Sequence, residues 1–302
     1  MSRIAYVNGR YFIHQAAAIH IEDRGYQFAD GIYEVFGVYK GKLIGTRGHL
    51  DRLAYSLSEL SIKNPMSERA IMHIVREIIR RNRIYNGLVY LQITRGIAPR
   101  DHAFPNQASP ILVVTGKSTK VSSDEELRSG ISVITIPDIR WGRVDIKSIS
   151  LLPNVLGKQL AKETGAYEAW MIDKNGFITE GTSTNAWIVT EEGELVTRSA
   201  TNGILNGITR LAVMDVAKEA GIRIVERPFT LKEAKKAREA FITASTTHVK
   251  PVTKIDGNSI GNGHIGIITL QLLDGFLKFI EKGTDSKNLH PRCRETKKIR
   301  HE

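Results

Sequence analysis

Two spacings of apolar residues alternate along the first 120 residues of the chain. Asn8-Gly9, flanked by apolar residues on both sides, is the strongest short-range signal for a β-hairpin. Behind Ser67, a good helix-capping residue, isoleucine and valine recur at helical spacing as far as Ile79. Other stretches are rich in β-branched and aromatic residues, which favour strands. We predict strands within residues 5–13 and at residues 32–39, 88–94 and 111–115, together with one helix from residue 68.

The pattern changes at residues 117–126, a polar stretch that we interpret as an interdomain linker. Beyond it, strands are predicted at residues 131–136, 167–172, 186–189 and 241–243. Helices are predicted from about residue 155, from about residue 209 and over residues 268–280. Gly165 and Gly221 are expected to end the first two. The sequence therefore predicts an α+β protein with an N-terminal domain at residues 1–120 and a larger C-terminal domain at residues 121–282.

The charge of the chain raises the question of nucleic-acid binding. The 302 residues include 43 Lys and Arg against 32 Asp and Glu, a net charge of +11. Residues 283–302 carry +3 of it, and we expect them to form a basic, disordered tail. Elsewhere the basic residues are interspersed with acids, a pattern typical of a solvated surface that attracts anionic metabolites. We expect small-molecule substrates and no nucleic acid.

Several other classes of protein are disfavoured. Cys293 is the only cysteine, which excludes an internal disulfide and fits a reducing compartment. No apolar stretch is long enough to span a bilayer, and no signal-peptide core follows Met1. Metal-binding, Walker, Rossmann and Gly-x-Ser-x-Gly motifs are missing from the sequence. We therefore expect a cytoplasmic protein without a metal or a membrane partner.

Two polar clusters carry candidate catalytic groups. In the first, Lys147 lies between Ile146 and Ile149, and partial desolvation there would lower the pKa of its amine towards nucleophilic use. The alternative is a surface lysine paired with Asp145. The second cluster, residues 179–185 (TEGTSTN), combines one carboxylate with a glycine and a row of hydroxyls. The carboxylate could face a pyridinium nitrogen while the hydroxyls bond other cofactor atoms, or the segment could be a hydrogen-bonded turn.

Two further clusters are candidates for binding anions. Residues 206–210 (NGITR) precede a predicted helix, whose first N–H groups together with the Thr209 hydroxyl could cradle a phosphate. Thr209 could instead be an ordinary N-cap. Residues 244–247 (ASTT) could supply further donors or form a plain turn. In residues 94–102, Arg100 and His102 follow a rigid proline and suit the capture of a small carboxylate, with a solvated basic loop as the alternative.

Taken in order, these clusters resemble the fold-type IV pyridoxal-phosphate aminotransferases over residues 6–280. Within that superfamily, three longer motifs resemble the D-amino-acid aminotransferases: residues 22–34 (EDRGYQFADGIYE), residues 94–105 (TRGIAPRDHAFP) and residues 138–148 (DIRWGRVDIKS). The resemblance implies a two-domain fold with a smaller N-terminal α/β domain and a larger, mixed, barrel-like C-terminal domain. It also implies pyridoxal 5'-phosphate as the cofactor.

Roles for individual residues follow from the same resemblance. Lys147 would hold the cofactor in a Schiff base and shuttle the proton, and Glu180 would keep the ring nitrogen protonated. The phosphate would be bound by Arg52, Ile208, Thr209 and Ser245, while Leu205 would pack against the ring. From the run of hydroxyls itself, we expect Ser183 to bond other cofactor atoms.

Substrate recognition is implied as well. Tyr33, Arg100 and His102 would bind the substrate carboxylate, and the loop that carries Arg100 would reach the neighbouring subunit's site, which implies a homodimer. Gly37 and His248 depart from the pattern, because D-amino-acid aminotransferases can carry a lysine and an acid there, and both departures leave the side-chain pocket open. The implied reaction moves the amino group of a D-amino acid such as D-alanine to a 2-oxo acid such as 2-oxoglutarate. The alternatives are a branched-chain L-amino-acid aminotransferase, which the carboxylate-binding loop disfavours, and a lyase of the aminodeoxychorismate type.

Overall fold

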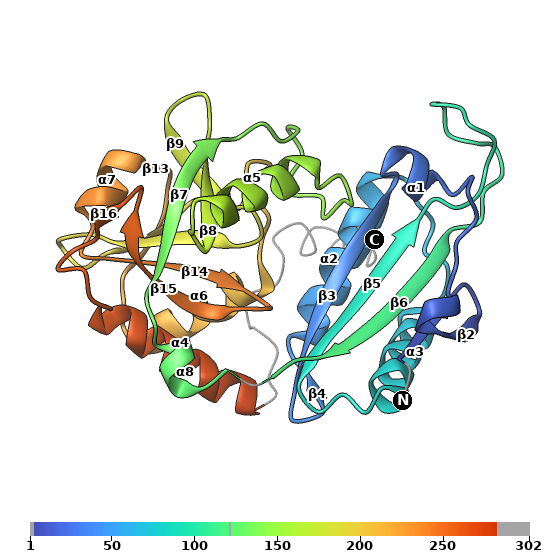
Figure 1. The fold of residues 1–302 in the computed structure, drawn as a ribbon, viewed down its shortest axis with the longest axis horizontal. Coiled ribbons are helices and arrows are strands. Elements are labelled where there is room, and N and C mark those ends of the chain that lie inside the picture. The colour runs from blue at the N-terminus through green and yellow to red at the C-terminus, as the bar shows by residue number, and fades with distance from the viewer. Residues whose placement is uncertain (1–2, 121, 283–302) are drawn as a thin grey trace, which may run out of the picture. The chain divides into compact units, whose positions relative to one another are not determined.

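The computed structural model describes residues 3–120 and 122–282, which form two compact units (Figure 1). The first unit contains residues 3–120 together with Ile146–Ser150, and the second contains Ser122–Asp145 together with residues 151–282. The predicted tail at residues 283–302 lies outside the described residues. None of the helices in the described ranges is long and apolar enough to cross a membrane.

The first unit is built on an antiparallel sheet of six strands. The strands are β1 (Ile4–Val7), β2 (Arg10–Ile13), β3 (Gly31–Tyr39), β4 (Lys42–Leu43), β5 (Gly87–Thr94) and β6 (Ile111–Ser118), in the order β2-β1-β6-β5-β3-β4. Asn8 and Gly9 join β1 to β2 with φ angles of 40° and 99°, the left-handed values that a tight hairpin needs. The hairpin and the three long strands are as the sequence predicted.

Helices cover this sheet and build its core. They are α1 (Arg24–Phe28), α2 (Thr46–Glu59) and α3 (Glu68–Arg81), with a 3-10 turn at His14–Ala16. The predicted cap of α3 is confirmed, because Ser67 accepts a hydrogen bond from the N–H of Ala70 at 3.3 Å. Apolar residues of α2 and α3 pack with those of β3, β5 and β6 in one buried cluster. Helix α2 was not predicted, because charged residues interrupt its apolar face.

A short segment from beyond residue 121 completes the first unit. The N–H of Ile149 donates to the carbonyl of Gly31 at 3.1 Å, and the N–H of Tyr33 donates to the carbonyl of Lys147 at 3.0 Å. Ile32 and Ser148 form an antiparallel bridge. One edge of β3 is paired with β5 along almost its whole length. At the opposite edge, β4 covers only the C-terminal end of β3, and Ile146–Ser150 pairs with the part that remains. This pairing fixes the backbone of Lys147 beside β3.

The second unit contains a mixed sheet of ten strands. They are β7 (Ile131–Pro137), β8 (Glu168–Ile172), β9 (Phe177–Gly181), β10 (Asn185–Val189), β11 (Leu195–Thr197), β12 (Ile224–Glu226), β13 (Phe229–Thr230), β14 (Glu239–Ala244), β15 (His248–Ile255) and β16 (Asn258–Ser259). The order is β12-β11-β10-β14-β15-β7-β8-β9-β13, with β16 beside β15. Only residues 227–228 separate β12 from β13 at the two ends of this order, so the sheet must curl back on itself.

The helices of the second unit are α4 (Asp124–Leu127), α5 (Leu152–Glu163), α6 (Ile208–Glu219), α7 (Leu231–Lys236) and α8 (Ile267–Lys282). Helix α4 lies inside the polar stretch interpreted as a linker, where Ser123 and Glu126 form a capping box. Helix α5 begins three residues before the predicted start, with a proline in its first turn, a position that suits the fixed φ of proline. Helices α6 and α8 pack together and against β14, and α8 also packs against β15.

Candidate active site

Lys147 is held by its backbone in the first unit. Its N–H donates to the hydroxyl of Ser56 in α2 at 3.1 Å, and its carbonyl accepts the bond from Tyr33. The amine of Lys147 lies 4.1 Å from the centre of the Tyr33 ring, and Tyr33 in turn stacks on Tyr90. The lysine is half-buried rather than on the open surface. The structure thus brings together Lys147 and Tyr33, two of the predicted site residues.

Beside Lys147 lies a buried group of charges. Arg52 in α2 donates from Nε and Nη2 to the two carboxylate oxygens of Glu34, both at 2.8 Å, and His49 Nδ1 lies 2.7 Å from Glu34 Oε2. Burial opposes ionisation of Glu34, but Arg52 and His49 outweigh it and hold the pKa of Glu34 well below its usual range. Burial lowers the pKa of His49, and the charges of Arg52 and Lys147 add to that effect. Arg52 is therefore fixed in a bidentate ion pair close to Lys147.

The loop that carries Arg100 and His102 is anchored by its main chain. Arg24, a buried residue, donates to the carbonyls of Asp101 at 2.6 Å and His102 at 3.3 Å. Arg24 is itself held by an ion pair with Asp30 at 2.8 Å. The side chains of Arg100 and His102 are exposed. The backbone of the loop is thus fixed, while its two predicted carboxylate-binding groups are exposed and lie against the ring of Phe28.

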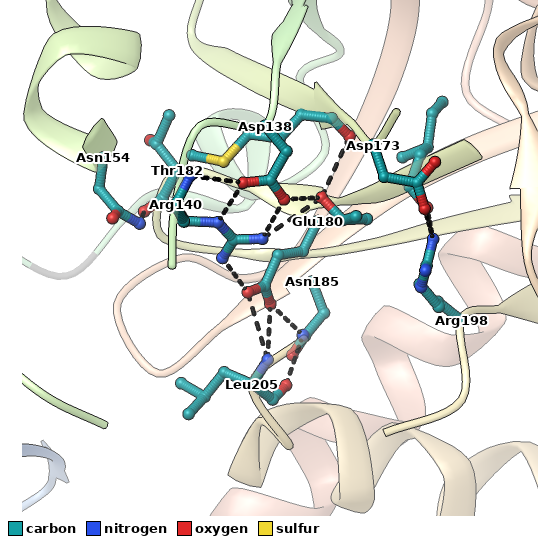
Figure 2. A network of polar contacts seen from close by, with 12 residues as sticks. Asp138, Arg140, Asn154, Asp173, Glu180, Thr182, Asn185, Arg198 and Leu205 are labelled. Atoms are coloured by element: carbon teal, nitrogen blue, oxygen red, sulfur yellow. Dashed lines mark hydrogen bonds and ion pairs between the residues drawn. The ribbon is translucent and has the colours of Figure 1, made fainter. Parts of the chain in front are cut away.

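In the second unit, Glu180 at the end of β9 is the centre of a buried network (Figure 2). Arg140 Nη1 lies 2.5 Å from Glu180 Oε1, and the side-chain amide of Asn185 donates to Oε2 at 2.9 Å. The N–H of Leu205 lies 3.2 Å from both oxygens. On its other side, Arg140 donates to both oxygens of Asp138, from Nε at 2.9 Å and from Nη2 at 2.7 Å.

The network around Glu180 contains more acidic than basic groups in direct contact. One guanidinium, that of Arg140, lies between the carboxylates of Asp138 and Glu180. Burial opposes ionisation of Asp138, but Arg140 and Thr179 lower its pKa. Burial raises the pKa of Glu180 even though Arg140 and the N–H of Leu205 favour its charged form. With both acids ionised, one negative charge remains uncompensated, so a cation such as a protonated ring nitrogen is a suitable partner for Glu180.

The row of hydroxyls after Glu180 has a partner of its own. Thr182, Ser183 and Thr184 all donate to the carboxylate of Glu168 in β8, and that carboxylate is fully buried. A Cβ added to Gly181 would lie 2.2 Å from the Thr184 hydroxyl, so this packing requires glycine. The structure thus shows the hydrogen-bonded turn that was one of the two interpretations of residues 179–185. A cofactor contact of Ser183 stays a prediction.

The predicted phosphate cradle is also in the second unit. Helix α6 has Gly207 as its N-cap with no side-chain capping bond, so its first N–H groups lack intrahelical partners. Thr209 lies inside the first turn, and its interpretation as the N-cap is wrong. Asn185 donates to the carbonyl of Leu205 at 2.8 Å and pairs with Thr243 in the sheet, which brings Glu180, the start of α6 and the end of β14 together.

Unsatisfied polar atoms occur in the turn after β14 and at the first residue of β15. Within residues 3–120 and 122–282, the buried Thr247 Oγ1 and His248 Nδ1 find no hydrogen-bond partner. Ser245, the predicted phosphate ligand, lies in the same turn and is half-buried. Buried polar atoms without partners are costly, so this turn and the uncapped start of α6 fit an anionic group.

Residues 31–255 match the family model described as amino-transferase class IV. The chain belongs to this family. D-alanine aminotransferase of Staphylococcus haemolyticus is 39% identical over 277 residues, which cover 91% of this chain and 97% of that protein. D-alanine aminotransferase of Bacillus licheniformis is 42% identical over 263 residues, or 87% and 92% of the two chains. Among solved structures, the branched-chain amino acid aminotransferase of Escherichia coli superposes with a TM-score of 0.86 at 23% identity, covering 95% and 97%.

Membership of the class IV amino-transferases confirms the predicted pyridoxal-phosphate-dependent aminotransferase, and the structural likeness confirms the predicted two-domain fold. Several residues of the site were not identified from the sequence. They are Glu34, His49, Arg140, Glu168 and Asn185. Arg140 and Asn185 lie within segments singled out above, but nothing in those segments indicated their contact with Glu180. For Glu34 a physical signal was present, because an acid at the centre of an apolar strand needs a buried counter-charge.

We predict that Glu34→Gln destabilises the first unit by about 3–5 kcal/mol, because the buried Arg52 would lose its counter-charge. The native pKa of Glu34 lies below its ordinary value of 4.5, so this stabilisation is present above about pH 4.5 and is lost as the pH falls. Urea denaturation of variant and wild type from pH 7 to pH 3 measures both effects, and the difference between the two proteins should shrink on acidification. Glu77→Gln, which breaks surface ion pairs with Arg80 and Arg81, is the control and should hardly change the midpoint. Equal shifts in the two variants would contradict the prediction.

Proposed function

We propose that this protein transfers the amino group of a D-amino acid, such as D-alanine, to a 2-oxo acid such as 2-oxoglutarate. The observation that carries the proposal is the match to D-alanine aminotransferases along almost the whole chain, at 39% identity over 91% of it. The branched-chain enzyme of Escherichia coli is similar at 23% identity, which supports the shared fold and not its substrate. Transfer from a branched-chain L-amino acid is the second candidate, because an enzyme named for that activity shares this fold.

The residues described above suit the cofactor of this reaction. When bound, pyridoxal phosphate supplies an electron-poor ring that accepts the electron pair left by the departing α-proton. We propose that Lys147 holds the cofactor aldehyde until the amino group of the substrate displaces it, and that the freed amine of Lys147 then moves this proton. Glu180 would face the ring nitrogen and Leu205 would pack against the ring. Further contacts are proposed for Arg52, Ser183, Ile208, Thr209 and Ser245, of which all but Ser183 would bind the phosphate.

The substrate carboxylate needs donors of its own. We propose that Tyr33, Arg100 and His102 bind it, with Arg100 and His102 acting on the site of the second protomer in a homodimer. The fixed backbone of their loop and the exposure of both side chains support this arrangement. A cytoplasmic location is also proposed, on the strength of the sequence alone.

The substrate class is tested by steady-state rates for a panel of D- and L-amino acids with 2-oxoglutarate as acceptor. We expect D-alanine to be converted to pyruvate only when the acceptor is present, with one glutamate formed for each pyruvate. Turnover of branched L-amino acids without turnover of D-alanine would overturn the proposal. Release of pyruvate without any acceptor would favour a lyase instead.

For Lys147→Ala we predict loss of turnover, because no other amine is proposed to hold the cofactor or move the proton. Lys162→Ala, which removes an exposed lysine of α5, is the matched control and should keep its activity. Borohydride reduction of the wild-type holoenzyme followed by peptide mapping should place the label on residue 147. A label on a different lysine would reject the assignment.

For Arg100→Ala we predict an increase of about 10- to 100-fold in KM for D-alanine, the effect of losing a hydrogen bond to a charged group. The absorbance of the bound cofactor should remain, because Arg100 is not proposed to touch it. Arg223→Ala, which breaks an exposed ion pair with Glu194, should leave KM unchanged. An unaltered KM in Arg100→Ala would remove this residue from the carboxylate site.

A further inference from the structure

We propose that Arg140 is a positioning residue for Glu180: it keeps this buried carboxylate ionised and orients it towards the ring nitrogen of the cofactor. This inference rests on the proposed function, because it concerns the group that Glu180 would face. It assigns a role to a residue that does not itself touch the cofactor in the proposed arrangement. Figure 2 shows the contacts from which it is argued.

The position of the Glu180 carboxylate is set by donors from three separate segments. Arg140 follows β7, Asn185 begins β10, and Leu205 precedes α6. An ionised carboxylate has about four acceptor positions. Arg140 and Asn185 each use one, and the single N–H of Leu205 is shared between the two oxygens at 3.2 Å. Because one shared donor does not saturate both oxygens, the carboxylate can accept a further N–H donor.

Arg140 is itself held rigidly by Asp138. Its Nε and Nη2 bond the two oxygens of Asp138, and this bidentate pairing fixes the plane of the guanidinium. Thr179 strengthens the arrangement, since its hydroxyl donates to Asp138 at 2.7 Å. The third nitrogen, Nη1, is then directed at Glu180. Only a planar cation with several donors can pair with both acids in this way.

The charge of Arg140 matters as much as its geometry. Burial alone favours the neutral acid form of Glu180, and an un-ionised carboxyl cannot balance a positive ring nitrogen. Arg140 opposes this effect at contact distance, while the negative charge of Asp138 adds to it. Arg210 is a further cation that interacts electrostatically with Glu180. Of the charged groups around Glu180, Arg140 makes the direct ion pair.

The first test follows the cofactor in the reconstituted holoenzyme. Protein loaded with ring-15N pyridoxal phosphate is examined by NMR, and the cofactor dissociation constant is measured by absorbance titration. In Arg140→Gln we expect the ring-nitrogen signal to move to the position of the unprotonated form and the dissociation constant to rise at least about tenfold. Arg140→Lys keeps the charge but not the bidentate geometry, so it should restore the protonated signal only in part. A wild-type signal and affinity in Arg140→Gln would overturn the proposal.

Arg198→Gln is the matched control. Arg198 forms a partly buried ion pair with Asp173 at 2.8 Å in the same unit, and Figure 2 shows this pair apart from the carboxylate of Glu180. The substitution removes the same chemical group from an ion pair without removing a donor to Glu180. The ring-nitrogen signal should therefore not move. An equal movement in both variants would show a general loss of structure and would overturn the specific role of Arg140.

A second test needs no cofactor and no Arg140 substitution. Infrared titration of the protonated carboxyl band, assigned to Glu180 by its absence in Glu180→Gln, reports the ionisation of this group directly. Asp138→Asn removes the competing negative charge, so the band should titrate at a lower pH than in the wild type. No change, or a change to higher pH, would overturn the coupling even if Arg140→Gln fails to fold. Failure of the proposed function would appear separately, as wild-type protein that neither retains pyridoxal phosphate nor converts D-alanine.

Discussion

Pairing of charges that have been removed from water is the interaction on which both units of this protein depend. An isolated carboxylate or guanidinium in an apolar interior costs several kcal/mol, so each must meet an opposite charge or lose its own. In the first unit the pair is Glu34 with Arg52, and in the second it is Glu180 with Arg140. Each pair joins two separate segments, β3 with α2 in the first unit and β9 with the segment after β7 in the second, so tertiary packing brings the charges together.

In neither unit do these charges cancel. Beside Glu34 the cations prevail: Arg52 balances its charge, and the amine of Lys147 acts as a further positive charge on His49, which burial keeps towards its neutral form. Around Arg140 the anions prevail, because two carboxylates share one guanidinium. A residual buried charge of either sign lowers the stability of the protein and attracts a group of opposite charge. Each of these groups of charges is thus locally less stable and better suited to bind a charged group.

The sequence predicted those parts of the molecule in which the local pattern agrees with the final structure. The Asn8-Gly9 hairpin, the cap at Ser67 and the main apolar strands have signals within a few residues. Strand β15 was not predicted, since Pro251 at its centre argues against an internal strand and gives no hint of the neighbours that accommodate it. The partners of Glu34 and Glu180 could not be predicted, for a different reason. The positions of Arg52 and Arg140 in the sequence do not indicate which acid lies beside each of them in the folded protein.

The assignment of Ile146–Ser150 to the first unit has a consequence for biosynthesis. The chain leaves the ribosome from its N-terminus, so residues 3–120 emerge without the strand-like segment that pairs with the exposed edge of β3. An open strand edge is a template for unwanted association. The first unit can reach its final form only after about thirty more residues have been translated, and by then part of the second unit has emerged as well. Lys147, for which we propose the central catalytic role, is therefore placed beside β3 by the same pairing that closes that edge.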